Sequence, residues 1–223
     1  MIKKELKLKA SKERAEILQR FFKTKKGEYG YGDIFIGVTV PVQRSIVKNH
    51  PELTLDYAIS LLKEKVHEYR SCGLMILVEK YKKGDQEVIV DLYFKNTKYI
   101  NNWDLVDLSA PKILGDFFFA KDKARLKNLL YSKNFWERRI AMVSTWGFIQ
   151  RGDIKTTFEY AKELLDDEHN LIHKATGWML REAGKKDKEA LKKFLDKNKM
   201  PRVALRYAIE RFSPEERLYY LKK

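Results

Sequence analysis

Apolar side chains recur every three or four residues along almost the whole chain, and this spacing predicts amphipathic helices of about 8–20 residues each. One stretch, Asp33–Val38, resembles a strand, but it is short and follows a loop rich in Gly and Tyr. Pro41 and Pro51 flank a short predicted helix. Ser213-Pro214-Glu215-Glu216 has the N-cap Ser, first-turn Pro and third-position Glu that are typical of a helix start. The pattern therefore predicts an all-α fold.

A repeat of about 34 residues underlies these helices. Arg70–Met75 is matched 68 residues later by Arg138–Val143, and a third copy, Lys174–Met179, begins 35 residues after Arg139. The segment Asn102–Asp107 falls at the intervening step. A period near 34 residues in a helical chain is typical of stacked helix pairs in an α-α superhelix, or solenoid. We therefore expect one domain over residues 1–223, whose repeat-aligned helices, near 67–82, 102–118, 134–150 and 168–183, line one concave groove.

The chain is strongly basic, with 46 Lys and Arg against 31 Asp and Glu and a formal net charge of +15. Such a balance favours a polyanionic partner, either a nucleic acid or an anionic membrane surface, although Lys residues also simply solvate surface helices. The single cysteine, Cys72, lies in an apolar stretch, which excludes a disulfide framework and a thiolate metal cluster. The first residues lack the apolar core of a signal peptide, and no run reaches membrane-spanning length. We therefore expect a cytoplasmic protein.

Trp103 and Asp107 are the most informative residues for chemistry. They are four residues apart, so on a helix they lie on one face about one turn from each other. Asp is unfavourable inside helices because its side chain competes for backbone hydrogen bonds. An Asp beside a Trp on an apolar face is therefore held for a purpose, and in a chain this basic the first candidate is chemistry on a nucleic acid. A structural pair with Arg139 is the alternative.

The repeat-aligned helices also carry cations and aromatic rings that suit a nucleic-acid duplex, because cations pair with phosphates and aromatic planes pack on sugars or bases. Trp136 and Trp146 are interpreted as packing residues. Loop 27–32, Gly-Glu-Tyr-Gly-Tyr-Gly, follows a helix and opens no βαβ unit, which argues against a dinucleotide site. It is either a surface turn or a loop that reaches DNA through its tyrosines. The expected DNA-binding residues are Arg70, Arg138, Lys174, Arg181, Tyr29, Tyr31 and Thr39.

Four short segments, spread over essentially the whole chain, carry a family resemblance. In order they are Phe35–Pro41, Asn102–Asp107, Asn134–Arg139 and Lys174–Glu182. Together they resemble the AlkD family of DNA alkylation-repair glycosylases, which are built from HEAT-like helical repeats.

This resemblance implies roles for particular residues. Asp107 corresponds to the catalytic carboxylate of the family. Trp103 and Trp178 correspond to the rings that pack on the deoxyribose of the damaged nucleotide, and Arg139 lies beside them. Members of the family often have a second Trp directly before the equivalent of Trp103, where this chain has Asn102. We expect this difference to affect which substrates the protein accepts.

The residues agree with this chemistry on independent grounds. Cleavage of an N-glycosidic bond builds positive charge on the sugar, and a fixed carboxylate stabilises that charge and orients the attacking water. A base that is already cationic through alkylation leaves as a neutral molecule and needs no strong acid. We therefore expect a monomeric glycosylase that releases 3-methyladenine and 7-methylguanine from double-stranded DNA without a cofactor.

Two alternatives from other classes remain. The first is a non-catalytic helical-repeat module that binds DNA or RNA structure, with Asp107 merely structural. The second is a protein-binding scaffold, against which the charge of +15 argues. His169 and His173 have the i,i+4 spacing of a metal pair, but neither a zincin Glu nor a third ligand accompanies them. We therefore expect no metal site.

Overall fold

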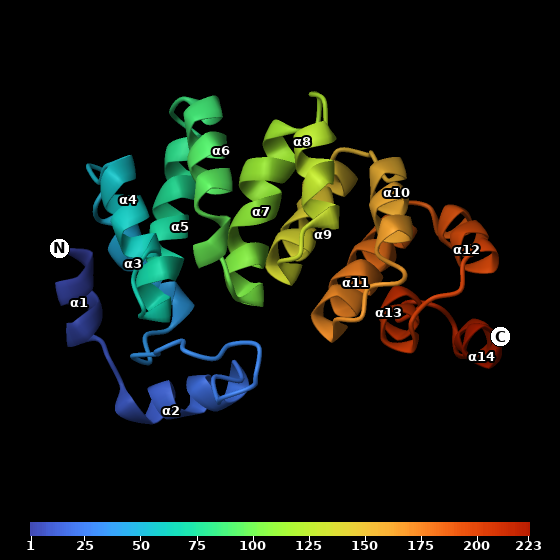
Figure 1. Ribbon diagram of the computed structural model, residues 1–223, viewed down its shortest axis with the longest axis horizontal. Coiled ribbons are helices and arrows are strands. Elements are labelled where there is room, and N and C mark those ends of the chain that lie inside the picture. The colour runs from blue at the N-terminus through green and yellow to red at the C-terminus, as the bar shows by residue number, and fades with distance from the viewer. The chain divides into compact units, whose positions relative to one another are not determined.

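The computed structural model describes all residues, 1–223, and its regular elements are all helices (Figure 1). Contacts between residues group into two compact units, Met1–Ser109 and Ala110–Lys223. The prediction of an all-α chain is confirmed. The strand-like segment Asp33–Val38 forms no sheet. Ile34 makes one isolated bridge with Val66. The expectation of one domain with a shared groove stays a prediction. None of the helices is both long and apolar enough to cross a membrane.

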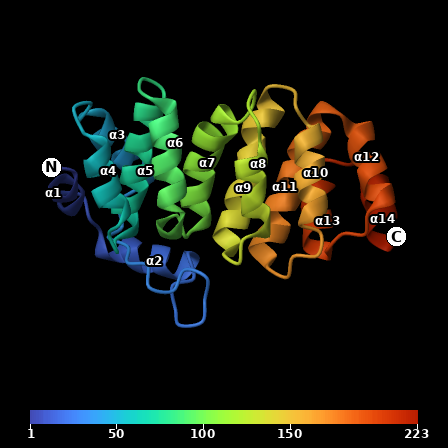
Figure 2. The ribbon, with the colours of Figure 1, turned by 45° about the horizontal axis from the view of Figure 1, so that its top comes forward.

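Unit 1 holds the helices that precede and include the start of α7. They are α1 (Ile2–Leu8), α2 (Lys12–Phe21), α3 (Val40–Lys48), α4 (Leu55–Leu62), α5 (His67–Tyr81), α6 (Gln86–Lys95), the 3-10 turn η1 (Thr97–Tyr99) and α7 (Trp103–Phe117), whose second half belongs to unit 2. Helices α1, α3, α4 and α6 all pack against α5. Nearly all residues of α5 are buried, including charged and polar ones near its start, so this helix lies at the centre of the unit. Helix α2 lies crosswise to the others (Figures 1 and 2).

Unit 2 is likewise built of helices that pack against one another. Its elements are α8 (Ala124–Lys127), the 3-10 turn η2 (Asn128–Tyr131), α9 (Phe135–Gln150), α10 (Lys155–Glu163), α11 (Asn170–Lys186), α12 (Lys188–Lys197), α13 (Arg202–Ala208) and α14 (Pro214–Lys222). Helix α11 packs against α9, α10, α12 and α13. The closest approach is at Gly177, where a Cβ atom would lie 2.3 Å from the carbonyl oxygen of Ala204. Only glycine permits that contact, which explains Gly177 in the third repeat copy.

The repeat predicted from the sequence corresponds to four long helices. Helices α5, α7, α9 and α11 each begin within two residues of the predicted start. The starts of α9 and α11 are fixed by local caps, because the Asn134 side chain accepts from Trp136 N and the His169 ring accepts from Leu171 N. The capping box at Ser213 and Glu216 is also formed, and Pro41 lies in the first turn of α3. The approximate helix starts and the Ser213 capping box depend on local interactions, which is why the sequence predicted them, whereas the caps by Asn134 and His169 were not predicted.

Candidate active site

Trp103 is the first residue of α7, and Asp107 follows one turn later. Both side chains are half-buried. Behind this turn the Tyr93 hydroxyl lies 2.9 Å from Ser109 Oγ, which donates to the carbonyl of Leu105. Burial raises the pKa of Tyr93, its hydrogen bond with Ser109 lowers it, and the nearby charge of Asp107 raises it further. The predicted placement of Trp103 and Asp107 on one helix turn is confirmed, whereas their roles stay predictions.

The ring of Trp103 is the outer plane of an aromatic stack. It lies on Phe22 at 5.1 Å between centroids and 16° between planes, and Phe22 lies on Phe35 at 4.8 Å. Phe21 meets the Trp103 ring edge-on at 5.9 Å and is itself 60% exposed. Stacked and edge-on contacts of this kind restrict the tilt of a ring. The face of Trp103 is therefore set by residues of α2 and of the loop that follows it.

Buried polar contacts hold the residues on both sides of Trp103. Asn102 is completely buried; its amide donates to Asp33 Oδ2 at 3.0 Å, and its oxygen accepts from Trp103 N at 2.8 Å. Asp104 Oδ2 lies 2.7 Å from Nε2 of His67, whose Nδ1 lies 3.1 Å from Asp33 Oδ2. His67 is only 2% exposed. The first turn of α7 is therefore tied to the loop before α3 and to the start of α5.

The charges of this network stabilise one another. Burial by itself lowers the pKa of His67, but the charge of Asp104 and the hydrogen bonds with Asp104 and Asp33 outweigh it and raise the pKa to about 9. Burial raises the pKa of Asp33, but the His67 hydrogen bond and the Arg70 and His67 charges lower it below its ordinary value. His67 is therefore a cation at neutral pH, bridging two carboxylates.

Arg70 completes this network and is 4% exposed. Its guanidinium donates to Asp33 and to the side-chain oxygen of Asn101. A guanidinium held this way is unlike the exposed cation that pairs with a phosphate. The placement therefore favours a structural role for Arg70 over the DNA contact expected from the sequence.

A second buried carboxylate, Glu68, holds the segment that carries the first family motif. One of its oxygens accepts from the backbone N–H groups of Gly37 at 2.8 Å, Ile36 at 3.1 Å and Val38 at 3.3 Å. This charge-assisted cluster fixes the loop against α5. Thr39, an expected DNA contact, directly follows as the half-buried N-cap residue of α3.

In unit 2, Trp178 and Arg139 lie on α11 and α9. Trp178 is half-buried, and its ring centroid is 5.8 Å from that of Trp146, which is also half-buried. Arg139 is 5% exposed and donates to the carbonyl of Leu171 at 2.8 Å. Trp136 is 5% exposed, as its interpretation as a packing residue requires.

The remaining expected DNA contacts differ in exposure. Lys174 and Tyr31 are exposed, the latter to 65%. Tyr29 is half-buried in the same loop. Arg138 forms an ion pair with Asp167, in which Nε lies 2.5 Å from the carboxylate. Arg181 forms ion pairs with Glu182 and Glu210 of the same unit. Lys174 and Tyr31 are therefore the exposed members of the set.

The two histidines of α11 serve the protein scaffold. His169 caps the helix, and its ring stacks on Phe135 at 3.8 Å, while Nε2 of His173 contacts the carbonyl of Asp167. Burial lowers the pKa of His169 below its ordinary value. The i,i+4 spacing of these histidines thus reflects a helix start.

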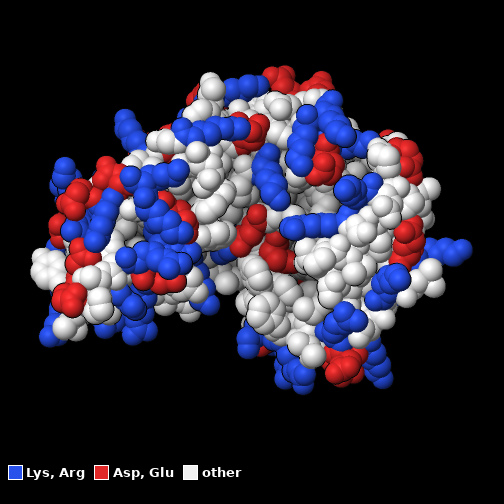
Figure 3. Space-filling model, turned by 180° about the vertical axis from the view of Figure 1, so that it is seen from behind, with Lys and Arg blue, Asp and Glu red and all other residues white.

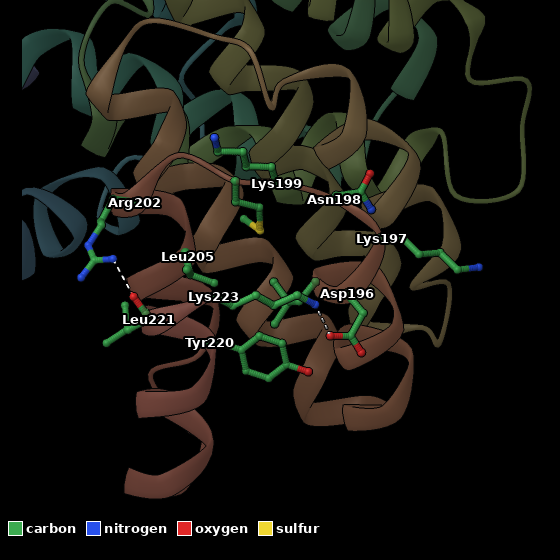
Figure 4. A pocket seen from close by; sticks show the side chains of 11 residues that line it. Asp196, Lys197, Asn198, Lys199, Arg202, Leu205, Tyr220, Leu221 and Lys223 are labelled. Atoms are coloured by element: carbon green, nitrogen blue, oxygen red, sulfur yellow. Dashed lines mark hydrogen bonds and ion pairs between the residues drawn. The ribbon is translucent and has the colours of Figure 1, made fainter.

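Lys and Arg side chains are scattered over the visible surface, mixed with acidic side chains and with uncharged areas (Figure 3). A hollow of about 640 Å³ lies between α12, α13 and α14 of unit 2 (Figure 4). Two cationic side chains that line the hollow form hydrogen bonds within the protein. Lys223 Nζ donates to Asp196 at 2.8 Å, and Arg202 donates to the carbonyl of Leu221. None of the residues predicted for the site lines this hollow.

Sequence reasoning missed Asp33, His67 and Asp104. Asp104 is adjacent to Trp103, and His67 begins the helix of the first repeat copy, but neither has a motif of its own. Along the chain, His67 is 34 residues from Asp33 and 37 residues from Asp104, so only the fold brings these residues together.

Comparisons with known proteins agree with the resemblance seen in the sequence. A family model described as DNA alkylation repair enzyme matches residues 2–212. A solved structure, described as a predicted DNA alkylation repair enzyme from Enterococcus faecalis, is similar with a TM-score of 0.72 and 16% identity, covering 92% of this chain and 98% of that one. At this identity the likeness concerns the fold, an all-α fold of helical repeats. No curated protein sequence matches the chain. Because the family match spans nearly its whole length, the chain belongs to the DNA alkylation repair enzyme family.

Proposed function

We propose that this protein is a cytoplasmic, monomeric DNA glycosylase that hydrolyses the N-glycosidic bond of cationic alkylated purines, such as 3-methyladenine and 7-methylguanine, in double-stranded DNA. Membership of the family supports repair of alkylated DNA. The observation that carries the specific activity is the pair formed by Trp103 and Asp107, half-buried on one turn of α7, with the Trp103 ring held in a defined plane.

In this proposal Asp107 is the catalytic carboxylate. As the glycosidic bond lengthens, positive charge develops on the deoxyribose, and the Asp107 carboxylate stabilises it and orients the attacking water. The face of Trp103 packs on the sugar and attracts the developing cation, a contribution of roughly 0.5–2 kcal/mol. The alkylated base leaves neutral, so no general acid is required.

The contribution of unit 2 is proposed from the family resemblance. Trp178 supplies a second ring for the sugar, and Arg139 assists beside it. Lys174 and Tyr31 contact the DNA backbone, and their exposure supports this assignment. Weaker contacts are assigned to Arg138, Arg181, Tyr29 and Thr39.

The substitution Asp107→Asn tests the assignment, because the amide keeps the shape of the side chain and loses its charge. We expect release of 7-methylguanine from duplex DNA to fall by about a hundredfold or more, with DNA affinity nearly unchanged. Asp116→Asn is the matched control, since Asp116 lies on the same helix and pairs with Arg151 at the surface. Wild-type release by Asp107→Asn would assign Asp107 to the structural alternative. If the wild-type protein binds the DNA but frees no base, the non-catalytic module is the correct interpretation.

The charge of the leaving base gives a second prediction. N3- and N7-alkylated purines should be released, whereas uracil and 8-oxoguanine should not, because a departing anion needs a proton donor. Liberated base from matched duplexes is measured by chromatography. Efficient release of uracil would contradict the proposed mechanism.

A further inference from the structure

We propose that His67 is a positioning residue for the catalytic turn: by bridging Asp33 and Asp104 it fixes the start of α7 and, through it, the orientation of Trp103. The role of Trp103 in catalysis rests on the proposed function, whereas its orientation by His67 is a property of the fold.

The bridge acts on both chain neighbours of Trp103. His67 bonds Asp104 directly, and it shares Asp33 Oδ2 with the amide of Asn102. Residues 102 and 104 are therefore both tied to the same imidazole, directly or through one carboxylate. Removing the imidazole disconnects Asp104 from Asp33. The residues before Trp103 stay tied to the loop through Asn102 and through Arg70, which donates to both Asn101 and Asp33. The backbone of Trp103 then loses the restraint that acts on the residue after it, Asp104.

The imidazole also supports the Trp103 ring through the aromatic stack. The His67 ring lies 4.4 Å from Phe35 at 22° and 5.2 Å from Phe22. Phe22 is the ring on which Trp103 lies. His67 thus reaches Trp103 by two routes, one through the helix backbone and one through stacked rings.

Burial makes these restraints stiff. His67 is 2% exposed, Asp33 8% and Asn102 0%, so water does not compete readily for their hydrogen bonds. A substituted side chain that leaves a carboxylate of this network unpaired therefore moves the turn, because the buried charge has to find a new partner. A shift of the Trp103 face on the order of an ångström is sufficient to weaken contact with the sugar cation.

The test compares His67→Gln with His50→Gln. His50 is a matched control in the same unit: its ring also bridges two carboxylates, with Nε2 2.5 Å from Glu5 and Nδ1 3.0 Å from Glu52, but it touches neither α7 nor the stack. We expect His67→Gln to slow single-turnover release of 7-methylguanine by about tenfold or more, with the DNA dissociation constant within about twofold of wild type. His50→Gln should release the base at the wild-type rate.

A second pair of variants separates positioning from stability. Asp104→Ala removes the acceptor for His67, whereas Asp104→Asn keeps an oxygen at that place. Asp104→Ala should slow release about as much as His67→Gln, Asp104→Asn should recover most of that loss, and the double variant His67→Gln/Asp104→Ala should be no slower than either single one, since all act on one link. Additive losses in the double variant would overturn the proposal. If His67→Gln does not fold, the two Asp104 variants carry the same test.

A spectroscopic readout makes the proposal independent of catalysis. With 5-fluorotryptophan incorporated, the chain gives ¹⁹F resonances from its four Trp residues, and Trp103→Phe identifies the one that belongs to Trp103. In His67→Gln and Asp104→Ala that resonance should shift or broaden while those of the other three stay in place. An unmoved Trp103 resonance, or equal movement of all four, would overturn the positioning role. If wild type releases no base but the Trp103 resonance behaves as expected, the proposed function fails and the positioning role stands.

Discussion

At the scale of single residues, the charge of His67 makes the stability of the fold depend on pH. Its pKa is raised from 6.5 to about 9 because, although burial favours the neutral form, Asp104 and Asp33 favour the cation more strongly. The folded state therefore binds a proton more tightly than the unfolded chain does. The resulting stability is fully present below pH 6.5, declines between pH 6.5 and about 9, and is absent above that range.

This linkage predicts how His67→Gln behaves with pH. The difference in unfolding free energy between wild type and variant should shrink by about 3 kcal/mol when the pH rises from about 6 to about 10. Urea denaturation across that range measures it. The difference in unfolding free energy between wild type and His50→Gln should change much less over this pH range, because the His50 ring pairs with solvent-exposed glutamates. A difference for His67→Gln that stays constant with pH would mean that His67 is not charged in the folded protein.

At the scale of elements, the loop between α2 and α3 depends on its contact with α5 and α2. Glu68 gathers three backbone N–H groups of this loop, and Gly37 adopts a φ of +79° at the same place. A Cβ atom on Gly37 would lie 2.1 Å from the carbonyl oxygen of Ser11 and 2.7 Å from Ala15 N. Both the backbone conformation and the lack of space therefore require glycine here.

Two alanine substitutions separate those requirements. Gly32 has a φ of +90°, but a Cβ atom there would meet only open space, so Gly32→Ala should lower the unfolding free energy by only about 1 kcal/mol. Gly37→Ala should lower it by several kcal/mol, because backbone atoms of α2 and its cap would have to move as well. Thermal and urea denaturation measure both. Equal losses for the two variants would show that the loop adapts and that the packing against Ser11 is not important.

At the scale of the whole molecule, the excess of cations predicts how the proposed binding of DNA depends on salt. A charge of +15 and cations on both units predict that affinity comes mainly from phosphates. The logarithm of the binding constant should therefore fall linearly with the logarithm of salt concentration, with a slope near −0.9 for each phosphate neutralised.

Titrations of undamaged duplexes of two different sequences at several salt concentrations measure this dependence. The two sequences should bind within about threefold of each other, because phosphate contacts carry no sequence information. Lys174→Ala should reduce the slope by about one unit, in keeping with loss of one phosphate contact. A flat salt response, or a strong preference for one sequence, would contradict phosphate-based binding.

Features that depend on neighbours within one or two helical turns could be predicted from the sequence. The starts of α9 and α11, the capping box at Ser213 and the one-turn spacing of Trp103 and Asp107 all follow from local periodicity and side-chain caps. The recurrence of α5, α7, α9 and α11 follows from the same periodicity repeated along the chain.

Which ionisable groups face one another depends on how the chain folds and could not be predicted from the sequence. By sequence, Arg70 was a candidate for phosphate binding and Asn102 a departure from the family pattern. In the structure the Arg70 guanidinium and the Asn102 amide both donate to Asp33. Along the chain, Asp33 is 37 residues from Arg70 and 69 residues from Asn102. The physical reason is burial: once the loop before α3 closes over the start of α5, each buried charge needs a partner within hydrogen-bond reach. That partner is fixed by the geometry of the fold and not by position along the chain.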